Sequence, residues 1–233
     1  MFLYEKGFYS SRQKSKQAIE TGRVFVNGKV VEKASMEVED NVKIEAKPFE
    51  FVSRGGYKLQ KAIEEFSIDL TDKVVLDIGA STGGFSDVCL KNGARKIYAV
   101  DTGEGQLAEE IKNNPKVLDM SKTNFLTLEK EKITDVDFVV IDVSFVSLTK
   151  LIPVLASDFD KVKIVALIKP QFECGLEYAR KHKGIVKDAK MHEKITKNIV
   201  ENFEKYGFKN NGIIVSPIKG GDGNTEFLIF VEK

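Results

Sequence analysis

Two charged residues stand at the ends of apolar stretches, where a buried strand would be expected to finish. Asp142 follows the run FVVI, and Lys169 follows the run VALI and precedes a proline. A lysine that ends such a run is expected to lie near a carboxylate in a partly desolvated site, because charged side chains are rarely buried without a partner. A lysine held in this way can favour the deprotonation of a hydroxyl that acts as a nucleophile.

Two more charged residues are candidates for the same site. Lys58 lies in SRGGYKL, and Glu226 lies in the turn sequence GDGNTEF. We predict that these two lysines and two acids converge at the carboxyl edge of a sheet, where open α/β sheets bind ligands. In this hypothesis Lys169 activates a hydroxyl, Asp142 positions and tunes Lys169, and Lys58 with Glu226 fixes the substrate and the lysine pair. Taken singly, Lys58 and Glu226 would equally fit exposed salt bridges.

A glycine-rich turn is the second chemical feature. The segment LDIGASTGGF, residues 76–85, reads as a buried strand, a turn and a helix start. Glycines let a ligand approach the backbone, and the first N–H groups of a helix attract a carboxylate or phosphate. About 20 residues further on, a strand ends at Asp101, where a carboxylate can accept the hydroxyls of a ribose. The alternative is a tight turn with a solvated Asp101.

The glycine spacing distinguishes between two cofactors. The turn reads GxxxGG, whereas the dinucleotide fingerprint is GxGxxG. We therefore predict S-adenosylmethionine in preference to NAD, and an NAD-dependent oxidoreductase is disfavoured. Asp77 would orient the amino group of the methionine moiety. The candidate cofactor-binding residues are Asp77, Gly79, Ser81, Gly83, Gly84, Phe85 and Asp101, with Asp119 and Met120 as weaker candidates for the adenine.

Alternating strand and helix patterns position these residues. They predict an α/β domain with a mostly parallel seven-stranded sheet and an antiparallel last strand, because buried strands recur between helical segments. Two strands at the C-terminal end read as a closing hairpin, an order expected of class I (Rossmann-like) methyltransferases. The expected strands are 74–79, 96–101, 136–143, 163–169, 213–218 and 227–232, and the expected helices are 57–66, 85–92, 106–113, 148–155 and 191–206. A polar stretch, 174–190, interrupts the alternation.

The N-terminal segment is basic and has its own elements. Six basic residues and one acidic residue lie between Lys6 and Lys29. Residues 11–21 carry helix start and stop signals. The sequence VFV-NG-KVV, residues 24–31, predicts a β-hairpin, because Asn-Gly favours a type I′ turn. Residues 42–46 are a further expected strand, and the boundary of this small α+β domain is expected near 47–54.

Basic side chains of this kind bind nucleic acid first through phosphate contacts. A second basic segment, residues 179–192, lies near the predicted active edge. A solvated helix face is the plainer reading of such charges. The candidate RNA-binding residues are Arg12, Lys14, Lys16, Arg23, Lys29, Arg54, Lys183 and Lys187.

Composition excludes other classes. Of the 233 residues 42% are hydrophobic and 30% charged, and no apolar run approaches the length of a membrane span. The first residues lack the apolar core of a signal peptide, which predicts a cytoplasmic protein. Two cysteines without a CxxC pair and two histidines are too few ligands for a structural zinc site, so no metal is expected.

Several segments together resemble a known family. LDIGASTGGF, VDTGEGQL, VVIDVSFVSL, IKPQFE, KGIVKD and GNTEF look like the TlyA-like (hemolysin A-type) family, in which an S4 RNA-binding domain precedes an FtsJ/RrmJ-type methyltransferase domain. The resemblance covers nearly the whole chain. It implies a catalytic tetrad of Lys58, Asp142, Lys169 and Glu226, and cytidine 2′-O-methylation of ribosomal RNA.

The resemblance also implies a domain organisation. We expect an S4-like domain over residues 1–47, a linker over 48–54 and the methyltransferase domain over 55–233. Because the chain starts at MFLYEKGF, a shortened first helix is expected in the S4-like domain. Two alternatives remain: an RNA-binding or ribosome-assembly protein without turnover, and a membrane-active hemolysin. The second is disfavoured, because the sequence contains no amphipathic basic helix long enough to insert.

Overall fold

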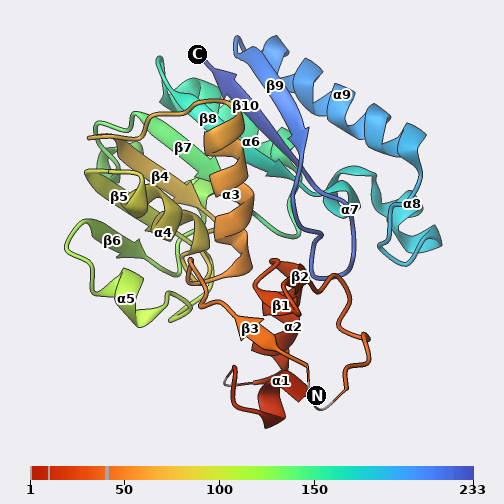
Figure 1. The fold of residues 1–233 in the computed structure, drawn as a ribbon. Helices are drawn as coiled ribbons and strands as arrows, with labels where there is room; N and C mark the ends of the chain where they lie inside the picture. Colours follow the sequence, from red (N-terminus) through yellow and green to blue (C-terminus); the bar gives the residue numbers. More distant parts are fainter. Residues whose placement is uncertain (1, 10, 40–41) are drawn as a thin grey trace. The chain divides into compact units, whose positions relative to one another are not determined.

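The computed structural model describes residues 2–9, 11–39 and 42–233 (Figure 1). Its chain divides into two compact units, Met1–Arg54 and Gly55–Lys233. They are called here the N-terminal unit and the C-terminal unit, and each has its own sheet.

The N-terminal unit packs two helices and a three-stranded antiparallel sheet around a small core. The Ser11 hydroxyl caps the second helix by accepting from the N–H of Lys14 at 3.1 Å. Asn27 and Gly28 have φ of 49° and 77°, as the predicted hairpin turn requires. The first helix is a single turn. The elements are α1 Phe2–Glu5, α2 Arg12–Glu20, β1 Val24–Val26, β2 Lys29–Val30 and β3 Ile44–Ala46, with strand order β2-β1-β3.

A seven-stranded sheet forms the centre of the C-terminal unit, in the order β6-β5-β4-β7-β8-β10-β9. Neighbouring strands from β6 to β8 are parallel, and β10 runs antiparallel to both β8 and β9. The predicted class I methyltransferase fold with its closing hairpin is thereby confirmed. The strands are β4 Val74–Ile78, β5 Lys96–Val100, β6 Val117–Met120, β7 Phe138–Ile141, β8 Lys163–Ile168, β9 Lys209–Val215 and β10 Phe227–Glu232.

Helices cover both faces of this sheet, which explains why its central strands are continuous apolar runs. Leu76 of β4 joins a core that includes Leu151 of α6 and Ile199 of α9, whereas the adjacent Asp77 contacts Ser86 of α4. In Figure 1, α9 runs alongside β9. The helices are α3 Arg54–Glu65, α4 Gly84–Lys91, α5 Glu109–Lys112, α6 Leu148–Asp158, α7 Pro170–Glu173, α8 Leu176–Lys181 and α9 Ala189–Lys205, with 3₁₀ turns η1 Phe125–Thr127 and η2 Lys130–Lys132.

Several segments differ from the sequence prediction. Helix α7 was not expected, and β9 spans Lys209–Val215 and not 213–218. The helix expected over 106–113 is reduced to α5, because the N–H of Ala108 donates to the carbonyl of Thr82 and keeps the preceding residues against the glycine turn. The stretch 174–190, expected to lack regular structure, contains α8. Tyr178 of α8 packs against the main core, a tertiary contact that local polarity does not reveal.

The strand register sets the position of the site. Ile78 of β4 pairs with Ile141 of β7, and Ile141 pairs with Ala166 of β8. The residues that follow these strands therefore meet at one edge of the sheet. Within the described part of the chain, no helix is long and apolar enough to cross a membrane.

We expect Leu76→Ala to lower the free energy of unfolding of the C-terminal unit by about 2–5 kcal/mol, because the side chain is fully buried in the main core. Leu118→Ala on β6 is the matched control. Leu118 is 46% exposed, so its truncation is expected to change stability by no more than about 0.5 kcal/mol. Urea denaturation followed by circular dichroism measures both, and equal effects would contradict the assignment of Leu76 to the core.

Candidate active site

Two ion pairs lie at the carboxyl edge of the sheet. Lys169 Nζ, directly after β8, is 2.7 Å from Asp142 Oδ1, directly after β7. Lys58 Nζ, on α3, is 2.5 Å from Glu226 Oε2, just before β10. Burial raises the pKa of Glu226; Lys58 opposes this effect, Asp142 adds to it and Lys169 also opposes it. All four predicted catalytic residues thus lie within electrostatic reach of one another.

The two pairs differ in their exposure. Lys58 and Glu226 are both buried, so the alternative of an exposed salt bridge is wrong for them. The side chains of Lys169 and Asp142 remain 12% and 21% exposed, which leaves this pair open to a substrate. Lys169 also donates to the hydroxyl of Ser144 at 2.9 Å, a contact that the sequence analysis did not include.

The glycine turn after β4 presses against the end of β7. Gly79 has φ of +86°, and a Cβ at this position would lie 2.6 Å from the carbonyl oxygen of Asp142. Gly83 also has positive φ and precedes α4, where Gly84 begins the helix. The predicted residue Phe85 is buried and does not line the adjacent cavity. The turn therefore brings backbone, not Phe85, to that cavity.

Asp77 is the most perturbed acid at this turn. One carboxylate oxygen accepts from the Ser86 hydroxyl at 2.6 Å, and the other is buried without a hydrogen-bond partner among the described residues. Burial raises the pKa of Asp77 to about 7, and the charges of Asp142 and Asp101 add to the effect. An unpartnered buried carboxylate oxygen fits a cationic amino group such as that of S-adenosylmethionine.

A cavity of about 430 Å³ adjoins the turn. Gly79, Ser81 and Asp101 line one side of it, and Asp142 and Ser144 line another. The carboxylate of Asp101 is fixed by the N–H groups of Ser81 and Gly103 at 2.8 and 2.7 Å. The cavity therefore joins the predicted cofactor turn to the Lys169–Asp142 pair.

The predicted adenine residues lie outside this cavity wall. Asp119 and Met120 end β6, where Asp119 accepts from the N–H of Ser121 at 3.0 Å. The lining at this side comes instead from residues 123–126, with Gln106 nearby. The amino-acid types of residues 123–126 do not indicate a cofactor site. Their position at the cavity depends on how the chain turns after β6.

Phe145 is a lining residue that sequence reasoning missed. Its side chain is 92% exposed, its φ is +65°, and its ring centroid lies 5.1 Å from that of Phe172. An exposed aromatic in the left-handed region is unusual enough to indicate a functional constraint. The sequence VSF gives no sign of this exposure.

The predicted RNA-binding residues of the N-terminal unit fall into two groups. Arg23 is paired with Glu50, and Arg54 is 2.6 Å from Glu20, so both have carboxylate partners. Lys16 lies 3.7 Å from Glu20 in a largely exposed pair. The remaining three predicted residues of this unit, Arg12, Lys14 and Lys29, are exposed, and the structure records no ion pair for them in the described segments.

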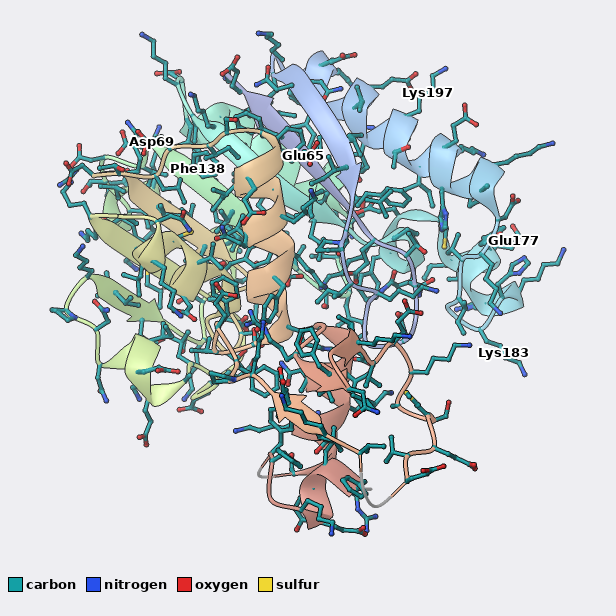
Figure 2. The ribbon with its side chains drawn as sticks, viewed as in Figure 1. Glu65, Asp69, Phe138, Glu177, Lys183 and Lys197 are labelled. Atoms are coloured by element: carbon teal, nitrogen blue, oxygen red, sulfur yellow. The ribbon has the colours of Figure 1, made fainter. Side chains whose placement is uncertain are left out.

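Lys183 and Lys187 are exposed on the segment between α8 and α9, and Lys183 projects from its outer side (Figure 2). Buried Asn224 ties this segment to the turn that carries Glu226. It accepts from the N–H of Val186 at 2.8 Å and donates to the carbonyl of Gly184 at 2.8 Å. The basic segment and the predicted active edge are therefore joined.

Comparison with known proteins agrees with this geometry. Residues 51–233 match the family described as FtsJ-like methyltransferase, and residues 1–44 match the S4 domain family. The chain is 40% identical to "Hemolysin A" of Brachyspira hyodysenteriae, over 97% of this chain and 96% of the relative. It is 35% identical to "16S/23S rRNA (cytidine-2'-O)-methyltransferase TlyA" of Mycobacterium tuberculosis, over 98% of this chain and 87% of the relative.

A solved structure is similar across both units. The "Putative hemolysin from Streptococcus thermophilus" has a TM-score of 0.77 and 39% identity, covering 99% of this chain and 86% of that chain. The predicted resemblance is confirmed, and the family match with the glycine turn identifies an enzyme that uses S-adenosylmethionine. The chain therefore belongs to the FtsJ-like methyltransferase family, in the TlyA-like group whose members carry an S4 domain.

Proposed function

We propose that the chain methylates the ribose 2′-hydroxyl of a cytidine in ribosomal RNA. The relative from M. tuberculosis, whose name states this reaction, is 35% identical over 98% of this chain. The observation that carries the proposal is the half-buried Lys169–Asp142 pair, because Asp142 lines the cavity beside the glycine turn and Ser144, which accepts from Lys169, lines it too. A hydroxyl entering this cavity would lie between the two residues that hold Lys169 and the cofactor turn.

Bound S-adenosylmethionine supplies a methyl group activated by a sulfonium. Asp77 would hold its amino group, the backbone of 79–83 would lie along the methionine moiety, and Asp101 would accept the ribose hydroxyls. The ring of Phe125 and the neighbouring lining residues offer a surface for the adenine. These groups fit the cofactor because they combine a buried acid, a glycine-rich turn and an apolar wall.

Lys169 is assigned the activation of the nucleophile. A ribose hydroxyl is a poor nucleophile near neutral pH, so the transfer requires help as its proton leaves. Nζ of Lys169 stabilises the 2′-oxygen, while Asp142 and Ser144 fix the direction in which Nζ points. Alignment of the 2′-oxygen with the methyl group accounts for the rest of the rate acceleration, because an in-line displacement depends on orientation.

The buried Lys58–Glu226 pair would support the ribose and the Lys169–Asp142 pair. The Glu226 carboxylate packs directly against Gly220. A Cβ on Gly220 would lie 2.6 Å from Glu226 Oε1, so a larger residue there would displace the carboxylate. Removing one partner of such a pair leaves a buried charge and typically costs about 3–5 kcal/mol. We therefore assign these two residues to positioning.

RNA would bind through phosphate contacts with Arg12, Lys14 and Lys29 of the N-terminal unit and with Lys183 and Lys187 of the C-terminal unit. These side chains are exposed, as phosphate binding requires. Phe145 adds an exposed ring at the cavity on which an unstacked base can rest. Single-stranded or loop RNA suits this arrangement, because its bases are free to leave the stack.

We expect Lys169→Ala to lower the rate of methyl transfer at least about 100-fold, because the developing charge on the 2′-oxygen loses its partner. Affinity for S-adenosylmethionine should change little. Single-turnover transfer of labelled methyl to ribosomal RNA and calorimetric binding measure the two quantities. Lys163→Ala, at the exposed start of the same strand, is the matched control. A Lys169→Ala protein that binds cofactor and methylates at the wild-type rate would refute the mechanism.

The triple variant Arg12→Ala/Lys14→Ala/Lys29→Ala should weaken RNA binding. Three lost phosphate contacts should make the slope of log affinity against log salt shallower by roughly 2 to 3. Filter binding at several salt concentrations gives this slope. The control is Lys130→Ala/Lys132→Ala/Lys161→Ala, whose residues precede β7 and β8 and lie at the opposite edge of the sheet. The same change in both triples would argue against docking through α2 and its hairpin.

Cofactor affinity should rise with pH. Because burial raises the pKa of Asp77 to about 7, its carboxyl is neutral below that pH and charged above it. Only the charged form attracts the amino group, so calorimetry should give about tenfold tighter binding at pH 8 than at pH 6. Asp77→Asn should remove most of this dependence, whereas exposed Asp69→Asn should retain it. A pH dependence that survives in Asp77→Asn would exclude this contact.

A further inference from the structure

The segment after β7 is joined to the segment after β8 at three places, which follow in the same order along both segments. Lys169 contacts Asp142 and Ser144. Three residues further on, the ring of Phe172 lies against that of Phe145. At the far end, the carboxylate of Glu173 accepts from the Ser147 hydroxyl at 2.5 Å and from the N–H of Leu148 at 2.8 Å. The loop that carries Asp142 is thus held at its start, middle and end.

Glu173 is an unusual group for this place. It is half-buried, and the structure gives it no ion pair with any cation of the described segments. Burial raises the pKa of Glu173, while the bonds from Ser147 and Leu148 lower it. Its partners belong to the N-terminal end of α6, an 11-residue helix, where free N–H groups and the helix dipole stabilise a negative charge. The carboxylate is therefore stabilised by α6 in place of a lysine or arginine.

The loop between the two ends needs such a support. Phe145 adopts φ of +65° although it carries a large side chain, a conformation that persists only where the surroundings impose it. Ser144, which accepts from Lys169, is its immediate neighbour. A loop free to relax Phe145 would also move Ser144 and Asp142 relative to Lys169.

We propose that Glu173 is a positioning residue for methyl transfer: by fixing Ser147 and the start of α6, it sets the loop that orients Lys169 and presents Phe145. The proposal rests on the proposed function of Lys169. Glu173 does not line the cavity and belongs to neither of the two ion pairs, so it acts through the loop.

Glu173→Ala tests this role in the full chain. We expect kcat for ribosomal RNA methylation to fall about 10- to 100-fold, because small displacements of aligned groups carry costs of this order. The Kd for S-adenosylmethionine should stay within about twofold of wild type, which general unfolding would not allow. KM for RNA should rise, because the variant also releases Phe145, on which a base is proposed to rest. Glu173→Gln, which keeps an acceptor for Leu148, should recover part of the rate. Glu177→Gln on α8, an exposed carboxylate, is the control.

Hydrogen exchange measured by mass spectrometry gives a readout that does not depend on activity. Amides of residues 143–148 should exchange faster in Glu173→Ala, while those of β4 stay unchanged. Ser147→Ala should also speed the exchange of these amides, because it removes the hydroxyl that donates to Glu173 and caps α6. Ser147→Ala also serves if Glu173→Ala does not fold.

The outcomes separate the two proposals. Unchanged exchange of 143–148 in both variants overturns the role of Glu173, whatever the activity. Faster exchange with wild-type kcat overturns it as well, and so does a loss of kcat matched by an equal loss of cofactor affinity. A fully active Lys169→Ala protein would instead refute the role assigned to Lys169, and a wild-type protein that does not methylate ribosomal RNA would refute the proposed function.

Discussion

The ion pair between Asp142 and Lys169 exists because β7 and β8 run in the same direction and end at the same edge of the sheet. Parallel strands direct their last residues into a shared space, and β4 adds its glycine turn to that space from the other side of β7. Cofactor turn and lysine thus become neighbours through backbone hydrogen bonding alone. Antiparallel β10 then returns Glu226 to the same edge, because its first residue pairs with Ile168 at the end of β8.

Buried acids at this edge are stabilised in three different ways. Glu226 has a buried lysine, Glu173 has the N-terminal end of α6, and one oxygen of Asp77 has no protein partner in the described segments. Burial of a carboxylate is costly unless its charge is compensated or lost. Glu226 and Glu173 therefore have their stabilising partners within the protein, whereas the unpartnered oxygen of Asp77 is suited to a ligand. This contrast separates the groups that hold the candidate site from the group proposed to receive the cofactor.

Much of the fold and part of the site followed from the sequence. The buried runs ending in Asp142 and Lys169, and the glycine turn, indicated the candidate active edge, because strand ends and turn residues have local signatures. Phe145, Asn224 and the pairing of Arg23 with Glu50 had none, since each depends on which distant segments meet. The helix α8 was missed for the same reason. Its polar sequence is stabilised by packing of Tyr178 on the main core.

Gly79 has a consequence for how such a protein can diverge. Because a Cβ there would overlap the Asp142 carbonyl oxygen, the cofactor turn and the end of β7 form one junction in which neither backbone can shift alone. Larger residues at this position would demand a matching displacement of the neighbouring strand. New substrate preferences are then more accessible through the segment 175–188 and the N-terminal unit, where changes leave the junction intact. Evolutionary variation should accordingly concentrate in those peripheral parts, with residue 79 invariant.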